Sequence, residues 1–522
     1  MSYIRISSVD SLDSSSTLTS TIGSVIHVGP LSNIRFAVFA LGSSAYPNFC
    51  AFGRFVDNML AELGGERIAK IATGDELCGQ EQVFTEWSKK LFREAVEVFC
   101  IGDEVNMSEV LQTASLRRTT WTTQDVKLIP TELPVNTIQT LAFGSHRKIV
   151  KFLLQSVTHL YESEGMERKT IKVCLEVEDR EQGFSYLPGD HLGIFPENAE
   201  TVVDAIADRL PNLDFDQTFI VLVKASGQTG QRGETDDWIP HERLPRASLR
   251  EALRRHIDIM APPSQQALAM LSQACDSDRE KDELRNLATE AQLYEDWKSQ
   301  NMPTFLDLLH MFPSLNPAAE FILTQMPPIQ PRFYSISSSP LFNSYQKYCA
   351  QRASGALNEK TSRIRSDGDG HSDCFQIDLT VAVVTFYSTR SRKLRHGVCS
   401  NFLYNMGTRD PGHLVYGFIR SAPNFRMPDK EDVPIVMVGP GTGIAPFRGF
   451  WLQRFASAKN QPHKRFGSMT LFFGCRLPCM QLYKDEVDQM KGAGVVRDVH
   501  IAFSRSPDHP KVRMRHASPR CR

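Results

Sequence analysis

The sequence predicts a mixed fold in which an antiparallel β-barrel stands between two α/β units. Two apolar runs, at residues 35–42 and 435–438, each lead through a turn into a helical pattern, which is typical of α/β units. Between them, residues 148–157, 169–177 and 186–196 show the alternation expected of antiparallel strands. With 522 residues the chain is long enough for about three to four domains.

The composition argues against several classes of protein. The chain carries 59 basic and 60 acidic side chains, a formal net charge of −1, so no basic surplus points to nucleic acid as a partner. No stretch approaches the ~20 apolar residues of a membrane span, and the first residues lack the pattern of a signal peptide. The 11 cysteines show no paired zinc-ligand spacing, so we expect no metal site and free thiols in the cytoplasm.

The first α/β unit is expected to be incomplete. Residues 1–33 are rich in Ser and Thr and predict a disordered leader. Residues 34–102 show a β-α-β-α pattern, with helices predicted at 52–63 and from 82 to about 99. This is too small for a complete doubly wound domain. A polar linker is expected at 103–140.

The barrel is expected over residues 141–430. A mostly helical insert at about 199–325 interrupts it, and strand patterns resume at RFYSISSSP and DLTVAVVTF. The polar segment 341–374 between these two strands predicts an extended surface loop. The second α/β unit is expected at 431–511, followed by a short basic tail at 512–522 that does not resemble a strand.

The run IVMVGPGTGIAPFRGFW, residues 435–451, predicts a nucleotide-phosphate site. Glycines at a strand-to-helix turn let backbone N–H groups approach an anion, and the helix N-terminus adds partial positive charge. A Gly-rich turn of an ordinary α/β domain is the alternative interpretation. The interpretation of this motif as a nucleotide site therefore depends mainly on the motifs that precede it in the sequence.

Three residues of RFYSISSSP predict a flavin dinucleotide site. Such a cofactor needs a cation for its pyrophosphate, an aromatic ring for its isoalloxazine and a hydroxyl near the reactive ring edge. Arg332, Tyr334 and Ser335 supply these groups. Arg332 and Tyr334 would share one face of a strand, and Ser335 would face the other way unless the strand kinks. The N–H groups of residues 397–400, before a predicted helix, could receive the second phosphate.

These motifs resemble the ferredoxin–NADP reductase module of diflavin reductases, and more narrowly the reductase half of an animal, insect-like nitric oxide synthase. The stretches FAVFALGSSAYPNFCAFG and GDELCGQEQ are similar to the second half of that family's FMN domain. YLPGDHLGIFPEN, RFYSISSSP, GVCSNFL, VGPGTGIAPFRGFW and LFFGCR are similar to its FAD and NADPH domains. The resemblance covers roughly residues 31–511. The residues of the motifs GDELCGQE and GVCSNFL favour the synthase over the microsomal cytochrome reductase, which has the same domain architecture.

The resemblance implies three cofactors, FMN, FAD and NADPH, and a set of residues for each. The FMN contacts would be Ser43, Tyr46, Cys50, Glu76 and Gln80, with Tyr46 stacked on the ring. The FAD contacts would be His191, Arg332, Tyr334, Ser335, Thr380, Ala382, Val398, Cys399 and Ser400, with Ser335 as the catalytic residue. The NADPH contacts would be Thr442, Arg476, Ser504 and Arg505, the last two around the 2′-phosphate, with Arg168 and Lys511 as less specific matches.

The sequence also departs from the family. Nothing resembles the haem oxygenase domain or the basic calmodulin-binding helix, so we expect no NO synthesis by this chain alone and no calmodulin binding. No Ser/Thr/Gly loop for the FMN phosphate precedes Arg35, so we expect an incomplete FMN site. After SRSPDHPK the sequence VRMRHASPRCR differs from the family, and of the residues that assist hydride transfer only Ser335 remains.

Several functions are compatible with this pattern. The first is electron transfer from NADPH to FAD and then to FMN, which this chain would carry out weakly or not at all. The second is a catalytically incomplete isoform that pairs with a full-length synthase and lowers its activity. The others are a splice product that does not fold stably and a cytochrome-reductase-like diflavin enzyme.

Overall fold

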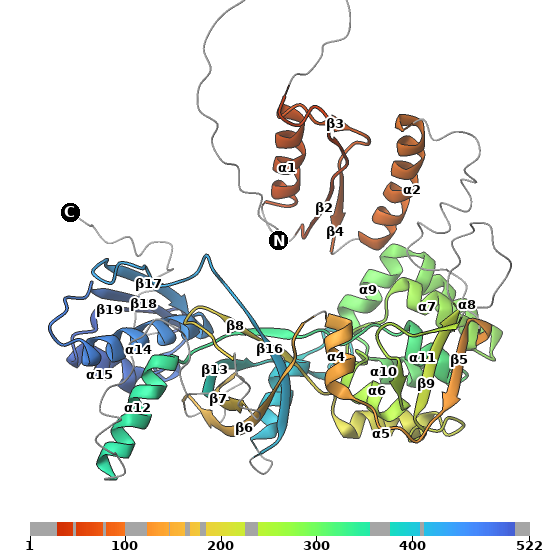
Figure 1. Ribbon diagram of the computed structural model, residues 1–522. Coiled ribbons are helices and arrows are strands. Elements are labelled where there is room, and N and C mark those ends of the chain that lie inside the picture. The colour runs from red at the N-terminus through yellow and green to blue at the C-terminus, as the bar shows by residue number, and fades with distance from the viewer. Residues whose placement is uncertain are drawn as a thin grey trace, which may run out of the picture. The chain divides into compact units, whose positions relative to one another are not determined.

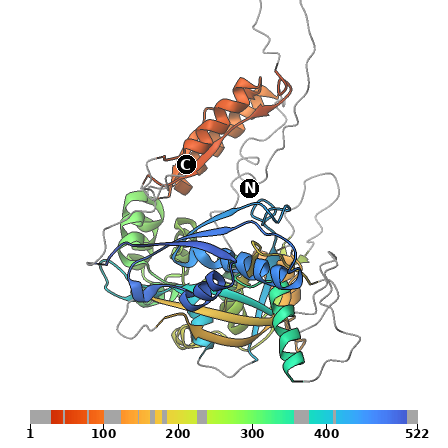
Figure 2. The same cartoon turned by 90° about the vertical axis from the view of Figure 1, so that its left-hand side faces the viewer.

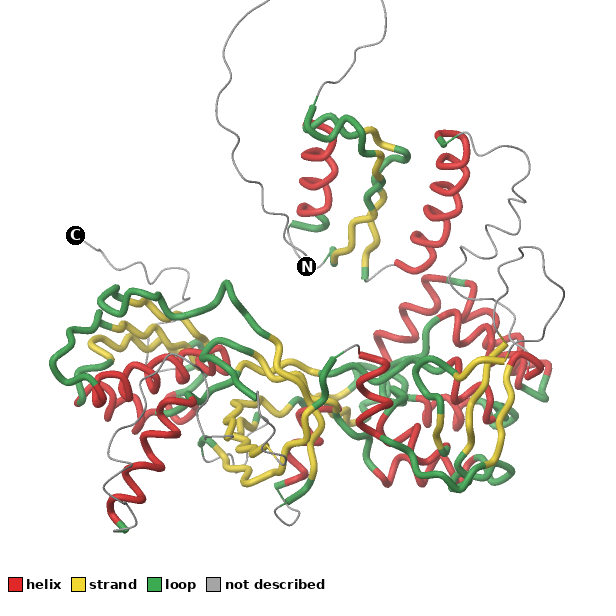
Figure 3. Tube along the Cα trace, viewed as in Figure 1, coloured by secondary structure: helices red, strands yellow, loops and turns green. Residues whose placement is uncertain are grey.

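The computed structural model describes residues 29–44, 48–76, 80–99, 123–145, 147–161, 168–177, 184–224, 238–354, 376–407 and 412–506. The chain divides into two compact units, residues 1–118 and 119–522, shown in Figures 1 and 3. The predicted Ser-rich leader and basic tail fall largely or wholly outside the described residues, so both stay predictions.

The first unit is built from short parallel strand pairs and two helices. β2 (Phe39–Gly42) pairs with β4 (Ala72–Asp75), and β1 (Arg35–Phe36) pairs with β3 (Glu66–Arg67). The helices are α1 (Ala51–Glu62) and α2 (Gln80–Val98). The ring of Phe39 contacts those of Phe84 and Trp87, with centroids 5.1 and 5.2 Å away. These aromatic side chains pack α2 against the strands.

An antiparallel sheet of six strands carries the centre of the second unit. Its order is β12-β8-β16-β6-β7-β13. The bounds are β12 (Arg332–Ser335), β8 (His191–Phe195), β16 (Leu414–Arg420), β6 (Val150–His159), β7 (Lys169–Val177) and β13 (Gln376–Val383). Its core includes Ile171, Leu192 and Leu379, all fully buried, and α13 (Val398–Met406) packs against it through Leu403. A small hairpin of β14 (Thr385–Tyr387) and β15 (Leu394–His396) follows β13.

The predicted antiparallel barrel is not closed by a continuous ladder. The edge strands β12 and β13 share no ladder, but the chain just after β12 meets β13 at an isolated bridge between Ile336 and Leu379. The N–H of Ser337 also donates to the carbonyl of Asp378, at 2.8 Å. Regular pairing ends there because the chain turns at Ser339 into a helix, so the sheet curls without closing.

The predicted helical insert contains seven helices among the described residues, together with a sheet that the periodicity did not indicate. The helices are α5 (Glu200–Arg209), α6 (Leu249–Arg255), α7 (Gln265–Leu271), α8 (Asp278–Thr289), α9 (Ala291–Asn301), α10 (Phe305–Met311) and α11 (Ala319–Gln325). The four-stranded sheet comprises β5 (Val126–Pro130), β9 (Phe219–Lys224), β10 (Trp238–Pro240) and β11 (Arg246–Ala247). β5 lies in the segment predicted as a polar linker and pairs antiparallel with β9. α4 (Thr137–Ser145) leads from there into the central sheet.

The surface loop predicted at 341–374 was wrong in its first part, because α12 (Pro340–Ala353) is a helix. The Ser339 hydroxyl accepts from the Phe342 N–H at 3.1 Å, and Pro340 occupies the first turn, where its missing N–H costs nothing. Phe342 and Tyr345 contact the ring of Phe455. The polar composition hid this helix, although Ser-Pro is a helix-start signal. The rest of the predicted loop lies outside the described residues.

The last part of the second unit is a parallel sheet in the order β17-β18-β19. Its elements are β17 (Ile435–Pro440), β18 (Met469–Cys475), β19 (Val496–Phe503), α14 (Ala445–Asn460) and α15 (Lys484–Gly492). Figures 1 and 2 show the two blue helices on the same side of this sheet. Trp451, Leu471 and Phe473 form its buried core.

A buried histidine at the end of α6 makes stability depend on pH. Burial lowers the pKa of His256 from 6.5 to about 4. As the pH falls, His256 is protonated in the unfolded chain before it is protonated in the folded chain. The contribution of the neutral imidazole to the free energy of unfolding is therefore fully present above pH 6.5 and is lost as the pH falls towards 4. We expect protonation of His256 to lower the free energy of unfolding by about 2–3 kcal/mol between these two pH values. Urea unfolding at pH 7 and pH 4.5 measures it. The variant His256→Phe should lose less stability over this pH change, and an equal loss would contradict the assignment.

Candidate flavin and nucleotide sites

The predicted FAD strand, β12, has a regular register. Tyr334 lies opposite Leu192 and Ser335 lies opposite His191. Arg332 and Tyr334 therefore share one face, and Ser335 lies on the other with His191, as alternation predicts for an unkinked strand. Burial, followed by the charge of Arg420, lowers the pKa of His191, so this imidazole is neutral at pH 7.

The first turn of α13 lies beside the face of β12 that carries Tyr334. The Tyr334 side chain packs against the buried cluster that contains Cys399 and Leu403 of α13. Burial raises the pKa of Tyr334, and it raises the pKa of Cys399 to about 12, so both groups stay protonated. The charge of Arg332, on the same strand face as Tyr334, acts in the opposite direction and lowers the pKa of both groups. The structure thus brings together the cation, the aromatic ring and the helix N-terminus.

Gly397 shapes this helix end. A Cβ at Gly397 would lie 2.9 Å from Cβ of Val384 and 3.0 Å from Oγ of Ser400, so a larger residue has no room. Gly397 is the N-cap and brings no side chain to the first-turn amides, which have no partners within the helix. The Ser400 hydroxyl instead accepts from the Val384 N–H, at 3.0 Å. This glycine-bounded helix end, with a cation beside it, fits a pyrophosphate.

Thr380 and Ala382 lie on β13, and they differ in exposure. Thr380 is buried, and its hydroxyl is 2.6 Å from the Tyr483 hydroxyl in a hydrogen bond to the nucleotide domain. Ala382 is exposed and lies two residues before Val384, whose carbonyl accepts from the Gly397 N–H. Ala382 therefore lies nearer to the helix end than Thr380 along the chain.

The predicted NADPH residues converge at the carboxyl edge of the parallel sheet. Thr442 follows β17, Arg476 follows β18, and Ser504 and Arg505 follow β19. The Ser504 N–H donates to the Cys475 carbonyl and the Arg505 N–H to the Arg476 carbonyl, each at 3.0 Å. Ser504 and Arg505 are exposed. Ligands of open α/β sheets bind at this edge.

The glycines before α14 are required by the backbone of the turn. A Cβ at Gly439 would lie 2.6 Å from the Gly443 carbonyl oxygen, so the strand and the turn approach too closely for a side chain. Gly441 has a φ of +54° and open space where its Cβ would be. The turn therefore presents backbone rather than side chains on that side. Of the two weaker matches, Arg168 is exposed at the start of β7, and Lys511 lies outside the described residues.

A buried arginine that sequence reasoning missed joins the FAD sheet to the nucleotide domain. Arg448 on α14 donates to the Ser337 carbonyl at 2.9 Å and to the Asp378 carboxylate at 2.8 Å. It also makes a bidentate pair with Glu486 of α15, which accepts from the Trp451 indole N–H as well. The signal was an arginine within the apolar run APFRGFW, but its partners are distant in sequence.

The predicted FMN residues lie mostly at the carboxyl ends of β2 and β4. Among the described residues, the buried Ser43 hydroxyl has no hydrogen-bond partner, and the Ser44 N–H donates to Asp75 at 3.1 Å. The Glu76 N–H donates to the Gly42 carbonyl at 2.9 Å, and the buried Cys50 thiol donates to the Ala40 carbonyl at 3.4 Å. Gln80 begins α2 nearby, and Tyr46 lies outside the described residues. A hollow of about 480 Å³ adjoins Ser43 and Cys50, which suits this edge as a cofactor site.

The described residues contain neither a metal-binding cluster nor a membrane-spanning helix. Among those residues, no group of three His, Cys, Asp or Glu side chains could hold a metal ion. None of the helices in the described part of the chain has both the length and the apolar character needed to cross a membrane.

Three domain families match the chain, in the same order along the sequence as the candidate FMN, FAD and NADPH sites. Residues 11–87 match flavodoxin, residues 145–346 match the FAD-binding domain, and residues 437–517 match the oxidoreductase NAD-binding domain. These domains bind FMN, FAD and a nicotinamide dinucleotide, and their succession defines a diflavin reductase. The predicted fold class is confirmed apart from closure of the barrel.

Similar whole proteins identify the family more narrowly. The chain is 39% identical over 507 residues to nitric oxide synthase from Anopheles stephensi. It is 39% identical over 514 residues to a nitric oxide synthase-like protein from Bombyx mori, and 37% identical over 513 residues to nitric oxide synthase from Drosophila melanogaster. Each match covers 97% of this chain and 37%, 43% and 35% of the relative, respectively. The chain corresponds to the reductase half of the nitric oxide synthase family.

Proposed function

We propose that this chain transfers electrons from NADPH to FAD and then to FMN. The observation that carries the proposal is the convergence of Arg332, Tyr334 and the α13 N-terminus, in a unit where Arg448 ties the same sheet to the nucleotide domain. The bound flavins supply the conversion between a two-electron hydride donor and one-electron acceptors. The protein supplies binding, alignment and exclusion of water.

Each group of the FAD site has a task that its chemistry supports. Arg332 binds the pyrophosphate, because a guanidinium pairs with phosphate oxygens in a bidentate geometry. The first-turn amides of α13, at Val398, Cys399 and Ser400, complete that anion site. Tyr334 would pack against the flavin ring through its aromatic face. Ser335, the last residue of β12, would supply a hydroxyl near the reactive edge of the ring and is the catalytic residue of the proposal.

The two outer cofactors are assigned in the same way. At the NADPH edge, Ser504 and Arg505 hold the 2′-phosphate, with Arg476 beside them and Thr442 at the turn before α14. At the FMN edge, the buried Ser43 hydroxyl, which has no partner among the described residues, can hydrogen-bond a polar group of the ligand. Glu76 and Gln80 lie at the same edge. Because hydroxyl and amide groups hydrogen-bond ring nitrogens and carbonyls, this edge suits a flavin ring.

The choice of nicotinamide cofactor tests the proposal. Supplied with FAD, the chain should reduce ferricyanide with NADPH in preference to NADH. The variant Arg505→Gln should raise KM for NADPH about 10-fold, since it removes one charge-assisted contact at an exposed site. KM for NADH should not change. No reduction with either cofactor by FAD-loaded protein would overturn the proposed function, and an unchanged KM for NADPH would remove Arg505 from the site.

The partner and the compartment are proposals of the same kind. We propose that the chain pairs with a full-length nitric oxide synthase subunit and does not bind calmodulin. Similarity to one part of larger synthases supports the pairing. All seven cysteines that the structure describes are free thiols, which suits a cytoplasmic location. Co-expression with a tagged synthase should give co-purification and lower NO output, and separate elution with full output would contradict the pairing.

A further inference from the structure

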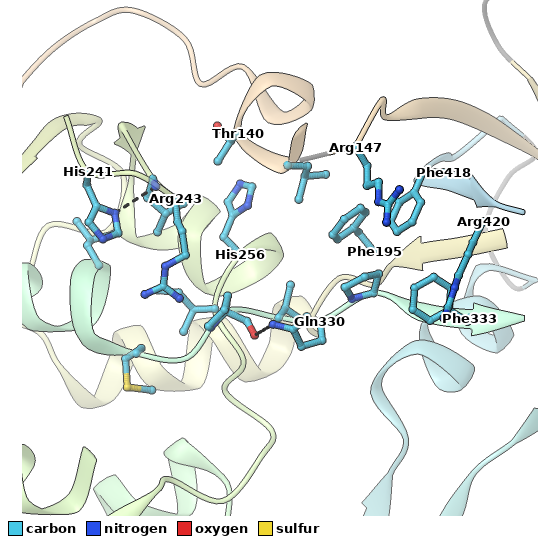
Figure 4. Close-up of a pocket in the computed structure, with 18 residues that line it drawn as sticks. Thr140, Arg147, Phe195, His241, Arg243, His256, Gln330, Phe333, Phe418 and Arg420 are labelled. Carbon is cyan, nitrogen blue, oxygen red and sulfur yellow. Dashed lines mark hydrogen bonds between the residues drawn. The ribbon is translucent and has the colours of Figure 1, made fainter. Parts of the chain in front are cut away.

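A cavity of about 370 Å³ lies between the central sheet and the helical insert. Figure 4 shows it, with Phe195, Phe333 and Phe418 on the side of the sheet and His256 on the side of the insert. Its volume falls within the range of small-molecule sites, which is about 300–1,000 Å³. None of the residues assigned above to FMN, FAD or NADPH lines it.

The cavity lies behind the FAD strand. Phe333 pairs in register with Gly193, which also pairs with Phe418, so the three residues share one face of the sheet. A Cβ at Gly193 would lie 3.0 Å from both rings. Tyr334 alternates to the opposite face, where it contacts Cys399. The strand therefore separates the cavity from Arg332 and Tyr334, whereas Ser335 and His191 share the face of the cavity but do not line it.

The wall of the cavity combines apolar side chains with positive charge. Arg420 lies over the ring of Phe333, 4.8 Å from the centroid, and Arg147 lies over the ring of Phe418 at 5.9 Å. Arg243 is a third arginine in the lining. No Asp or Glu is among the described residues that line the cavity. Such a site attracts an anion that has an apolar body.

A buried nitrogen points to a ligand in the same place. His256 is 7% exposed, and its Nε2 has no hydrogen-bond partner in the described structure. Figure 4 shows this imidazole directed into the cavity. A buried polar atom without a partner costs about 1–3 kcal/mol, which a ligand atom would recover. His241, whose Nδ1 accepts from the Leu244 N–H at 3.2 Å, is a second imidazole in the lining.

We propose that this cavity binds a small aromatic carboxylate. The ring system packs among the phenylalanines, where offset and edge contacts between rings are favourable. The carboxylate lies towards Arg147 and Arg420, because the planar guanidinium matches a carboxylate better than any other side chain does. The Nε2 of His256 gains its missing hydrogen bond from a polar atom of the ligand.

Calorimetric titration of the full chain with 2-naphthoate and the neutral 2-naphthamide tests the proposal. We expect one naphthoate per chain and at least about 10-fold weaker binding of the amide, since it lacks the charge-assisted bond. Arg147→Gln should weaken naphthoate binding and leave amide binding unchanged. His256→Phe should weaken the binding of 6-hydroxy-2-naphthoate, which carries a second polar atom, about 10-fold more than that of naphthoate, whereas His310→Phe, at an exposed position of α10, should have no effect on either.

Three results would overturn the proposal. Equal affinity for acid and amide would exclude recognition of the charge. If Arg147→Gln binds naphthoate as tightly as the original chain, the ligand does not bind in this cavity. Arg147 lies on the sheet side, so this variant does not disturb the packing around His256. Displacement of naphthoate by FAD would place the ligand in the flavin site instead, and this outcome is independent of whether the chain reduces ferricyanide.

Discussion

Replacing Arg448 by methionine is expected to lower the free energy of unfolding by about 3–5 kcal/mol, because it removes a buried cation and leaves two partly buried carboxylates without their partner. Arg448 is 6% exposed and bonds to Asp378 and Glu486 at once. Methionine retains most of the side-chain length, so the loss reports the charge and hydrogen bonds more than packing. Equilibrium urea unfolding, followed by circular dichroism, measures the change.

A second arginine serves as the control for this prediction. Arg250 also pairs with two carboxylates, those of Asp204 and Asp216, but its side chain is 34% exposed. Solvent screens such pairs, so Arg250→Met should cost less than about 1 kcal/mol. Equal losses for the two variants would show that the network of Arg448 does not fix the sheet to the nucleotide domain.

The second large effect concerns the affinity for FAD. Arg332→Gln should raise the Kd for FAD about 10- to 100-fold, because glutamine retains polarity but cannot make a charge-assisted bond to phosphate. Arg332 is exposed, and its Nη1 donates only to the Gln330 carbonyl in the bonds described, so the substitution should leave the fold intact. Titration of flavin-free protein, followed by the quenching of FAD fluorescence, measures this Kd.

The matched control lies in the nucleotide domain. Arg497 is an exposed arginine on β19 that pairs with the adjacent Asp498. Arg497→Gln makes the same change of charge and should leave the Kd for FAD unaltered. If both variants bind FAD as tightly as the original chain, the pyrophosphate does not lie beside Arg332.

Local patterns predicted the parts of the site that are continuous in sequence. RFYSISSSP supplied β12, and GVCSNFL supplied the glycine-capped start of α13. Alternation along one strand correctly separated Tyr334 from Ser335. Each of these features depends on neighbours within a few residues, so propensity and spacing suffice to find it.

The remaining features depend on contacts between distant parts of the chain. The partners of Arg448 lie at residues 337, 378 and 486, and no local spacing indicates them. β5 was missed because it becomes a strand only by pairing with β9, about 90 residues further on. The cavity behind β12 was missed for the same reason, since its walls come from the sheet and from the insert.

The most direct test of the central claim is an anaerobic absorbance spectrum of the FAD-loaded chain before and after addition of NADPH. The account predicts that the visible flavin band decreases when NADPH is added, and that Arg332→Gln needs a higher FAD concentration to show the same decrease. Protein that fails to retain FAD, or that retains it and keeps the full band with excess NADPH, would contradict the account.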